Sequence, residues 1–286
     1  MSTSALDPST STQSFLTLRQ IQEAELQILI AFQEFCNQNG LFFSLCGGSL
    51  LGAVRHQGFI PWDDDIDVNV PRGDFERLLK MSQEGVEIGR YRIVPCCVSD
   101  DVADSSYLKI VDPTIATHEA EILAGHNGSL WIDVIPMDGV SGDDAEWADE
   151  YDRATKLRRI ASYANVRPLG AAKKWKALLR WPVVMYVQAF HRAGPAEKKL
   201  TALAKSRTVD ESTHVACVTK GLYGLGERVV KEDYFSTVPV QFEGQTMMVM
   251  SCWDSYLHGI YGDYMQIPPE NKRHTHDLLA WPIDNR

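Results

Sequence analysis

The spacing of apolar residues predicts both helices and strands along this chain. Apolar positions recur at helical spacing from Leu18 to Asn39, and Gly40 follows as a C-terminal stop. The same spacing predicts helices at Arg72–Met81 and Trp253–Ile260. Short apolar runs predict strands at 41–46, 91–98, 107–112, 130–139, 214–218 and 247–250. We therefore expect an α+β fold.

Several aspartates interrupt this pattern between residues 63 and 67. Asp65 and Asp67 alternate with apolar residues, so on a strand both carboxylates would face the same side. Neighbouring carboxylates repel each other, and a divalent cation removes this conflict because Mg²⁺ prefers carboxylate oxygen and often keeps a substrate phosphate as a ligand. The alternation predicts a metal site at Asp65 and Asp67. Asp63 and Asp64 are interpreted as loop residues or as supports of that site.

A glycine turn precedes these aspartates. Gly47, Gly48 and Ser49 follow the apolar run 41–46 and begin what is predicted to be a short helix. Glycine lets the backbone approach a ligand closely, and a helix N-terminus presents N–H groups that suit a phosphate. Most turns of this kind are merely tight, so the prediction of a phosphate site depends on the aspartates that follow.

Two basic residues near these segments allow two interpretations each. Arg55 lies at the end of the short helix, where it either contacts a phosphate or an aspartate, or complements the helix dipole. His56 is interpreted as a structural hydrogen-bonding residue. Lys109 lies among apolar neighbours, where an unpaired charge is costly. Its side chain either extends to the surface, which is the commoner case, or points towards the aspartates or a phosphate.

A third carboxylate lies on a later predicted strand. Asp133 stands between two apolar residues, and an isolated buried carboxylate is unfavourable unless it is paired or binds a metal. We therefore assign Asp133 to the same site as Asp65 and Asp67. Asp138, which precedes Gly139, is expected to be a turn residue.

Composition narrows the class of protein. The 286 residues are 44% hydrophobic and 23% charged, as in an ordinary globular protein with a substantial core. The net charge of −10 argues against general nucleic-acid binding. None of the six cysteines is spaced as CxxC, so neither a zinc site nor a disulfide framework is predicted. Residues 1–14 lack an apolar signal core and no run would span a bilayer, so we expect a disordered leader and a cytoplasmic protein.

The charge pattern changes after residue 142. An acidic segment, 143–152, is followed by a basic segment, 153–180, with nine Lys or Arg and no acidic residue. The basic segment and the apolar run that follows it, 181–190, allow two interpretations. They form either a basic lobe that contacts an anionic acceptor or the inner membrane face, or a helical pair with one solvated face and one buried face. We favour the helical pair. The predicted divisions are a core at 15–142, a helical lobe at 143–212, and a part at 213–286 that completes the core and the active site.

The segment Tyr261–His276 is rich in tyrosine, glycine and proline, which predicts a structured loop. Tyr261 and Tyr264 either pack in the ordinary way, or stack on a base or face a quaternary ammonium group. Arg273 and His276 are candidates for phosphate contacts.

A glycine turn at a helix start and three carboxylates on two strands are what a nucleotidyltransferase fold needs for two-metal chemistry. Three segments of this sequence, Gly47–Val68, Trp131–Gly139 and Tyr261–His276, also resemble the three signature blocks of the LicD family. They are spread across nearly the whole chain, and the first block is long and specific. The resemblance implies a nucleotidyltransferase-like mixed sheet that is flanked by helices and carries an additional helical lobe.

The resemblance also implies roles for individual residues. The metal-binding aspartate pair of the family matches Asp65 and Asp67, and the acidic residue of its later strand matches Asp133. Ser49 stands where threonine is usual and keeps the hydroxyl group. Asn69 stands where an apolar residue is usual. The cysteine-based zinc site of the fukutin-related branch has no counterpart, so we expect no zinc.

LicD proteins resemble phosphocholine transferases, which use CDP-choline to modify the sugars of bacterial teichoic acid or lipopolysaccharide. The animal fukutin-related proteins, which use CDP-ribitol, share the catalytic block. The resemblance implies two Mg²⁺ ions, with Mn²⁺ as a substitute, a CDP-activated alcohol (choline first) and a glycan acceptor, free or lipid-linked. The donor diphosphate would lie over Gly47, Gly48 and Ser49, and Asp133 would lie nearest the attacking hydroxyl. The phosphate charge would be neutralised by Arg55, Lys109, Arg273 and His276.

Two alternatives stay open at this level. A nucleotidyltransferase of the same fold would move a nucleoside monophosphate onto a small molecule, so the product mass separates the two reactions. A catalytically silent nucleotide-binding regulator is the other alternative, although three carboxylates would then have no metal to hold.

Overall fold

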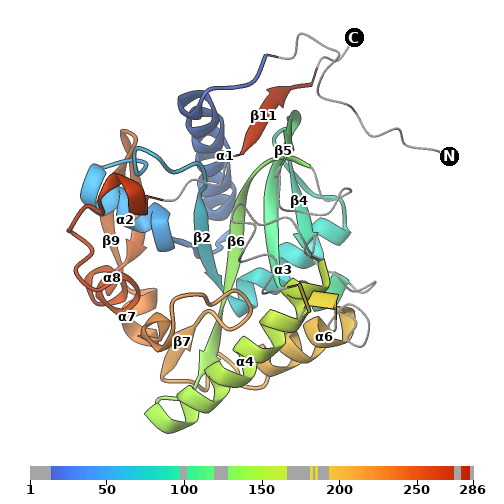
Figure 1. Cartoon of the computed structure of the whole chain (residues 1–286), viewed down its shortest axis with the longest axis vertical. Helices are drawn as coiled ribbons and strands as arrows, with labels where there is room; N and C mark the ends of the chain where they lie inside the picture. Colours follow the sequence, from blue (N-terminus) through green and yellow to red (C-terminus); the bar gives the residue numbers. More distant parts are fainter. Residues whose placement is uncertain are drawn as a thin grey trace, which may run out of the picture.

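The computed structural model describes residues 14–96, 102–118, 128–165, 181–182, 184–185, 193–273 and 278–283. Its centre is a mixed β-sheet in the order β1-β2-β6-β5-β4-β3 (Figure 1). These strands are β1 (Ser44–Leu45), β2 (Asp67–Pro71), β3 (Glu87–Ile88), β4 (Tyr91–Cys96), β5 (Tyr107–His118) and β6 (Ser129–Val140). β2 and β6 are parallel, and the other neighbours in this order are antiparallel. The predicted α+β class is confirmed.

The last third of the chain returns to this sheet. β7 (His214–Ala216) pairs with the end of β6 and with β8 (Val229–Val230), and β11 (Leu279–Pro282) pairs with β5. β9 (Thr237–Phe242) and β10 (Gln245–Met250) form a separate antiparallel pair. The limits of the predicted domains stay a prediction, but residues far apart in the sequence share one sheet.

Helix α1 (Leu18–Asn39) has the bounds that its apolar spacing predicts. Thr17 caps its N-terminus in a capping box with Gln20, and Gly40 ends it in the left-handed conformation with φ 57°. Its buried face carries Ile28, Leu29 and Phe32, which join the main core. This local chemistry is sufficient to define a long helix.

The remaining helices flank the sheet. α2 (Gly47–His56) packs against α8 (Trp253–Tyr261), and α3 (Arg72–Gln83) lies against β4 and β6. α7 (Lys231–Phe235) follows β8, and one-turn helices occur at η1 (Val102–Asp104), η2 (Leu225–Glu227) and η3 (Glu270–Lys272). α2, α7 and α8 gather with β9 on one side of the sheet (Figure 1). Residues from β1 to α8 therefore share one main core.

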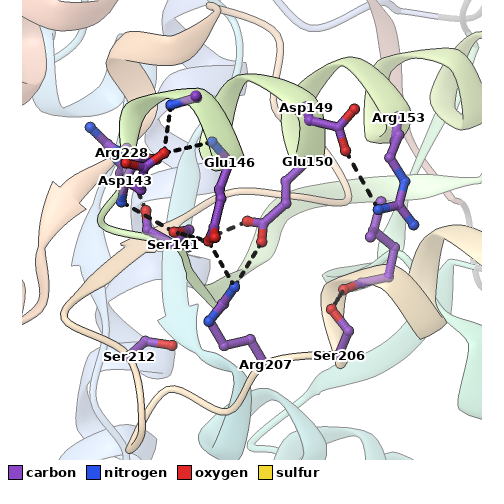
Figure 2. Close-up of polar contacts among 12 residues, drawn as sticks. Ser141, Asp143, Glu146, Asp149, Glu150, Arg153, Ser206, Arg207, Ser212 and Arg228 are labelled. Atoms are coloured by element: carbon purple, nitrogen blue, oxygen red, sulfur yellow. Dashed lines mark hydrogen bonds and ion pairs between the residues drawn. The ribbon is translucent and has the colours of Figure 1, made fainter.

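Helices α4 (Asp144–Asn165) and α6 (Ala193–Ala204) lie side by side at another edge of the molecule (Figure 1). A smaller core, with Trp147 and Leu200 among its members, joins them to β7. The acidic start of α4 is engaged in ion pairs. Figure 2 shows Arg207 between Glu146 and Glu150, at 3.6 and 3.1 Å.

Most of the predicted basic lobe, residues 166–180, 183 and 186–192, lies outside the described residues. Its predicted membrane contact stays a prediction. Among the described helices, none is long and apolar enough to cross a membrane.

Two expectations from the sequence are wrong. The run 41–46 has only two residues in a strand, Ser44 and Leu45. Asp138 is not in a turn, because it lies within β6, is fully buried and accepts a 2.6 Å hydrogen bond from Nε of Arg72. The strand continues through Asp138 because Arg72, which begins α3 on another part of the chain, compensates its charge.

Candidate active site

The two strands that carry the predicted metal ligands are neighbours in the sheet. Asp67 on β2 and Asp133 on β6 are register partners, so their side chains leave the same face. The Asp133 N–H donates to the Ile66 carbonyl oxygen at 2.9 Å. Val68 and Val134, the next register pair, are fully buried on the other face. Apolar burial on one face thus places both carboxylates on the other.

The remaining aspartates precede β2. Asp65 is partly exposed, like Asp67, and the residue between them is buried, which keeps the alternation that the sequence shows. Asp64 is buried and accepts a 3.3 Å hydrogen bond from the Leu278 N–H. A Cβ atom added to Gly48 would lie 2.9 Å from Oδ2 of Asp63. Asp63 therefore closes over the first turn of α2, and Asp64 holds a C-terminal segment.

The glycine turn lies directly against the aspartate strand. Gly47 has φ +51°, which only glycine adopts readily, and a Cβ there would lie 3.7 Å from Oδ2 of Asp67 and 3.8 Å from the Tyr261 hydroxyl. The Asp67 N–H donates to Oγ of Ser49 at 2.8 Å. The Gly47 N–H donates to the Tyr256 hydroxyl at 3.3 Å. The N-terminus of α2 and the Asp67 carboxylate therefore share one small region.

The buried oxygen Oδ1 of Asp133 is a candidate ligand of the predicted metal ion. It has no hydrogen-bond partner within the part of the chain that the structure describes. Mg²⁺ is usually held by one or two carboxylates, and it takes its other ligands from water and substrate phosphate. Asp67 and Asp133 fit such an ion. In the same described part, no three His, Cys, Asp or Glu side chains form a ready-made metal site, and the assignment of two ions to Asp65, Asp67 and Asp133 stays a prediction.

Lys220 is a residue of this site that sequence reasoning missed. Its Nζ donates to Oδ2 of Asp133 at 3.3 Å and lies 3.8 Å from the centre of the Tyr107 ring. Burial alone would lower the pKa of the ammonium group, but the negative charges of Asp133, which has the larger effect, and Asp67 outweigh it, and the pKa is raised. Lys220 stays protonated beside the carboxylates. No periodic signal marks it, because only the pairing of β7 with β6 brings it there.

The other predicted phosphate ligands are spread more widely. Lys109 is the register partner of Asp133 on β5, but its Nζ lies 3.3 Å from the centre of the Trp131 ring. Arg55 lies in the last turn of α2, away from Gly47, and donates to the Tyr264 carbonyl oxygen at 2.8 Å.

Two candidates come from the C-terminal loop. The Arg273 guanidinium lies 4.3 Å from the centre of the Trp62 ring and donates to the Pro268 carbonyl oxygen at 3.2 Å. His276 lies outside the described residues. In the structure Arg55 and Arg273 support the loop around the site, and their predicted phosphate contacts stay predictions.

Comparison with known proteins identifies the class of domain that contains the glycine turn and the aspartates. Residues 40–112 match the model of the LicD/FKTN/FKRP nucleotidyltransferase domain, and they contain the glycine turn, the aspartates between residues 63 and 67, and Lys109. The chain is also 28% identical over 268 residues to the lipopolysaccharide cholinephosphotransferase LicD of Haemophilus influenzae, which covers 92% of this chain and 97% of that protein. Residues 40–112 therefore match a domain of the LicD family, and the similarity to the LicD protein of Haemophilus influenzae extends over most of the chain.

Two shorter similarities are to uncharacterised rickettsial proteins. One from Rickettsia typhi is 36% identical over 75 residues, or 25% of this chain and 24% of its own length. One from Rickettsia prowazekii is 35% identical over 63 residues, or 22% of this chain and 24% of its own length. These matches carry no statement about activity.

Proposed function

We propose that this chain is a phosphotransferase that moves phosphocholine to a sugar hydroxyl of a lipopolysaccharide. The observation that carries the proposal is the pairing of Asp67 with Asp133 beside the glycine turn, in a chain similar along 92% of its length to a lipopolysaccharide cholinephosphotransferase. The fold alone would not suffice, because one fold hosts many reactions. The residues at the site are those that phosphoryl transfer requires.

The donor that suits this site is CDP-choline. The acceptor oxygen would bond to the phosphorus that carries choline, the bond from that phosphorus to the bridging oxygen would break, and CMP would leave with that oxygen. The hydroxyl proton would pass to the Asp133 carboxylate. The first turn of α2 would face the diphosphate, and Lys220 would offset its charge beside Asp133.

Asp67 and Asp133, with Asp65 beside them, would hold Mg²⁺. When bound, the ion supplies charge neutralisation on the phosphate oxygens. The support for this assignment is that the buried Oδ1 of Asp133 has no hydrogen-bond partner in the described part of the chain, and that carboxylate oxygen is a ligand that Mg²⁺ prefers.

The product mass tests the reaction. The protein is incubated with Mg²⁺, CDP-choline and a lipopolysaccharide or a teichoic acid acceptor, and the glycan is weighed by mass spectrometry. We expect the acceptor to gain phosphocholine and one CMP to appear for each transfer. A gain of a nucleotide would show nucleotidyl transfer instead, and no release of CMP with any acceptor would overturn the proposal.

The substitution Asp67→Asn tests the assignment of the metal ligands. It keeps the size of the side chain and removes the charge, so we expect transfer to be abolished while the melting temperature stays close to that of the wild type. Asp65→Asn is expected to behave in the same way. Near-normal turnover in both variants would overturn the assignment of the metal ligands.

A further inference from the structure

Three aromatic rings around the site already hold a cation of the protein itself. In each case a Lys or Arg lies over the ring face: Lys109 over Trp131 at 3.3 Å, Lys220 over Tyr107 at 3.8 Å and Arg273 over Trp62 at 4.3 Å. A cation–π contact with a ligand would have to displace these charges. Trp131, Tyr107 and Trp62 are therefore poor sites for the cation of a ligand.

Tyr264, a candidate from the sequence, is also engaged. Its side chain is buried, and its hydroxyl donates a 2.5 Å hydrogen bond to Oδ1 of Asp254. His258 packs against its ring at 4.8 Å between centroids. Tyr264 therefore supports the loop after α8, and its ring is too deeply buried to meet a ligand.

Tyr223 and Tyr261 form a different pair beside the glycine turn. Their ring centres are 5.0 Å apart at an interplanar angle of 71°, and the Tyr261 hydroxyl donates to that of Tyr223 at 3.2 Å. At this angle and distance the edge of one ring meets the face of the other, and the two rings form a corner. Tyr223 is 44% exposed, so the corner is open to solvent. In the described part of the chain, no cation of the protein lies over either ring.

The position of this corner suits the alcohol end of the donor. The Tyr261 hydroxyl lies 3.8 Å from where a Cβ of Gly47 would be, and the same point is 3.7 Å from Oδ2 of Asp67.

The loop that carries Tyr223 is held by a dense set of contacts. The Glu227 carboxylate accepts the N–H groups of Leu222 and Tyr223, and the Gly224 N–H donates to the Tyr151 hydroxyl at 2.9 Å. Ordered walls favour binding, because a ligand then does not have to organise them.

We propose that Tyr223 and Tyr261 form the binding site for the quaternary ammonium group of the donor. This inference rests on the proposed function, since it locates one end of a CDP-choline donor whose diphosphate faces the first turn of α2. A trimethylammonium group placed in the corner contacts the π-face of one ring and lies beside the other ring. A neutral group of the same shape gains only the apolar contact.

The test measures this difference by isothermal titration in Mg²⁺ without an acceptor. The two ligands are CDP-choline and its uncharged carbon isostere, the CDP ester of 3,3-dimethylbutanol. We expect the wild type to bind CDP-choline about 5- to 30-fold more tightly than the isostere, as a cation–π contact provides. Tyr223→Leu and Tyr261→Leu should lose most of this ratio, and Tyr223→Phe should keep it, because phenylalanine retains the ring.

Phe235→Leu is the matched control. Phe235 is an exposed ring on α7 that packs with Phe42 and Tyr234, and its loss should leave the ratio unchanged. An unchanged ratio in both tyrosine-to-leucine variants would overturn this inference while the proposed function stands. A wild type that binds neither CDP ester would overturn both. Loss of folding is monitored by the affinity for CDP, which all variants should keep.

Discussion

At the scale of single residues, Lys220 changes the picture of the site most. It places a positive charge 3.3 Å from Oδ2 of Asp133, on a carboxylate whose other oxygen has no hydrogen-bond partner in the described part of the chain. Asp133 thus has one oxygen directed to a cation of the protein and one available to a bound ion. Lys109, although it is the register partner of Asp133, is turned to Trp131.

The variant Lys220→Met tests this assignment. We expect kcat/KM for transfer from CDP-choline to fall by about 10²- to 10³-fold, because a fixed charge next to the reacting phosphate is lost. Lys109→Met should cost clearly less, since it removes a cation that lies on Trp131. CMP release is the measurement, and equal losses in the two variants would contradict the distinction.

Glu227 gives a pH-dependent prediction. Burial raises the pKa of its carboxyl to about 7, against the weaker opposing effects of the Tyr223 and Leu222 N–H groups and Arg158. A raised pKa means that the folded state binds the proton more tightly than the unfolded state. Stability from this group is therefore present below about pH 4.5 and is lost as the pH rises to about 7, by on the order of 3 kcal/mol.

Chemical denaturation of the wild type and of Glu227→Gln between pH 4.5 and 8 measures this effect. We expect the free energy of unfolding of the wild type to fall relative to that of the variant across this range. A difference that is constant with pH would show that Glu227 titrates normally.

At the scale of elements, the contact between η2 and α8 decides where Tyr223 and Tyr261 meet. Gly226 and Gly259 touch through their backbones, and a Cβ on either would overlap the carbonyl oxygen of the other. Tyr223 precedes η2, and Tyr261 is the last residue of α8. The two glycines therefore set the spacing of the two rings.

Gly226→Ala should push η2 away from α8. We expect a loss of about 1 to 3 kcal/mol of stability, as for overpacking, together with weaker binding of CDP-choline. Gly73→Ala is the matched control, because Gly73 lies in α3 with nothing within 4 Å of an added Cβ. That change should be neutral or stabilising by up to about 1 kcal/mol. Thermal unfolding that ranks the two variants equally would contradict the role of the contact.

At the scale of the whole molecule, the candidate site combines residues from three parts of the chain that lie far apart in the sequence. The aspartates and the glycine turn come from the first quarter, Asp133 from the middle, and Lys220, Tyr223 and Tyr261 from the last third. β7 and β11 hold the last third on the sheet. A ligand that bridges these parts should stabilise the entire fold.

A thermal-shift panel tests this with CDP-choline, CDP-ribitol, CDP-glycerol and ATP, each with Mg²⁺. At about 100 times its dissociation constant, a ligand raises the free energy of unfolding by about 2.7 kcal/mol. We expect the largest shift with CDP-choline, and removal of Mg²⁺ with EDTA should reduce it. Stabilisation by ATP alone would exclude a CDP-alcohol as the donor.

The sequence by itself determined the elements whose signals are local. Periodicity and caps defined α1, the alternation before Val68 placed Asp65 and Asp67 on one side, and family blocks indicated the chemistry of the site. These signals need only neighbouring residues, because side-chain direction repeats along a helix or a strand.

Only the tertiary structure decided which distant residues join them. Asp138 is a buried partner of Arg72 because α3 begins beside the end of β6, and Lys220 reaches Asp133 because β7 pairs with β6. Tyr223 meets Tyr261 because two glycines let η2 and α8 touch. Each of these contacts is set by the packing of elements far apart in the chain, and the local pattern of hydrophobic and polar residues does not encode such packing.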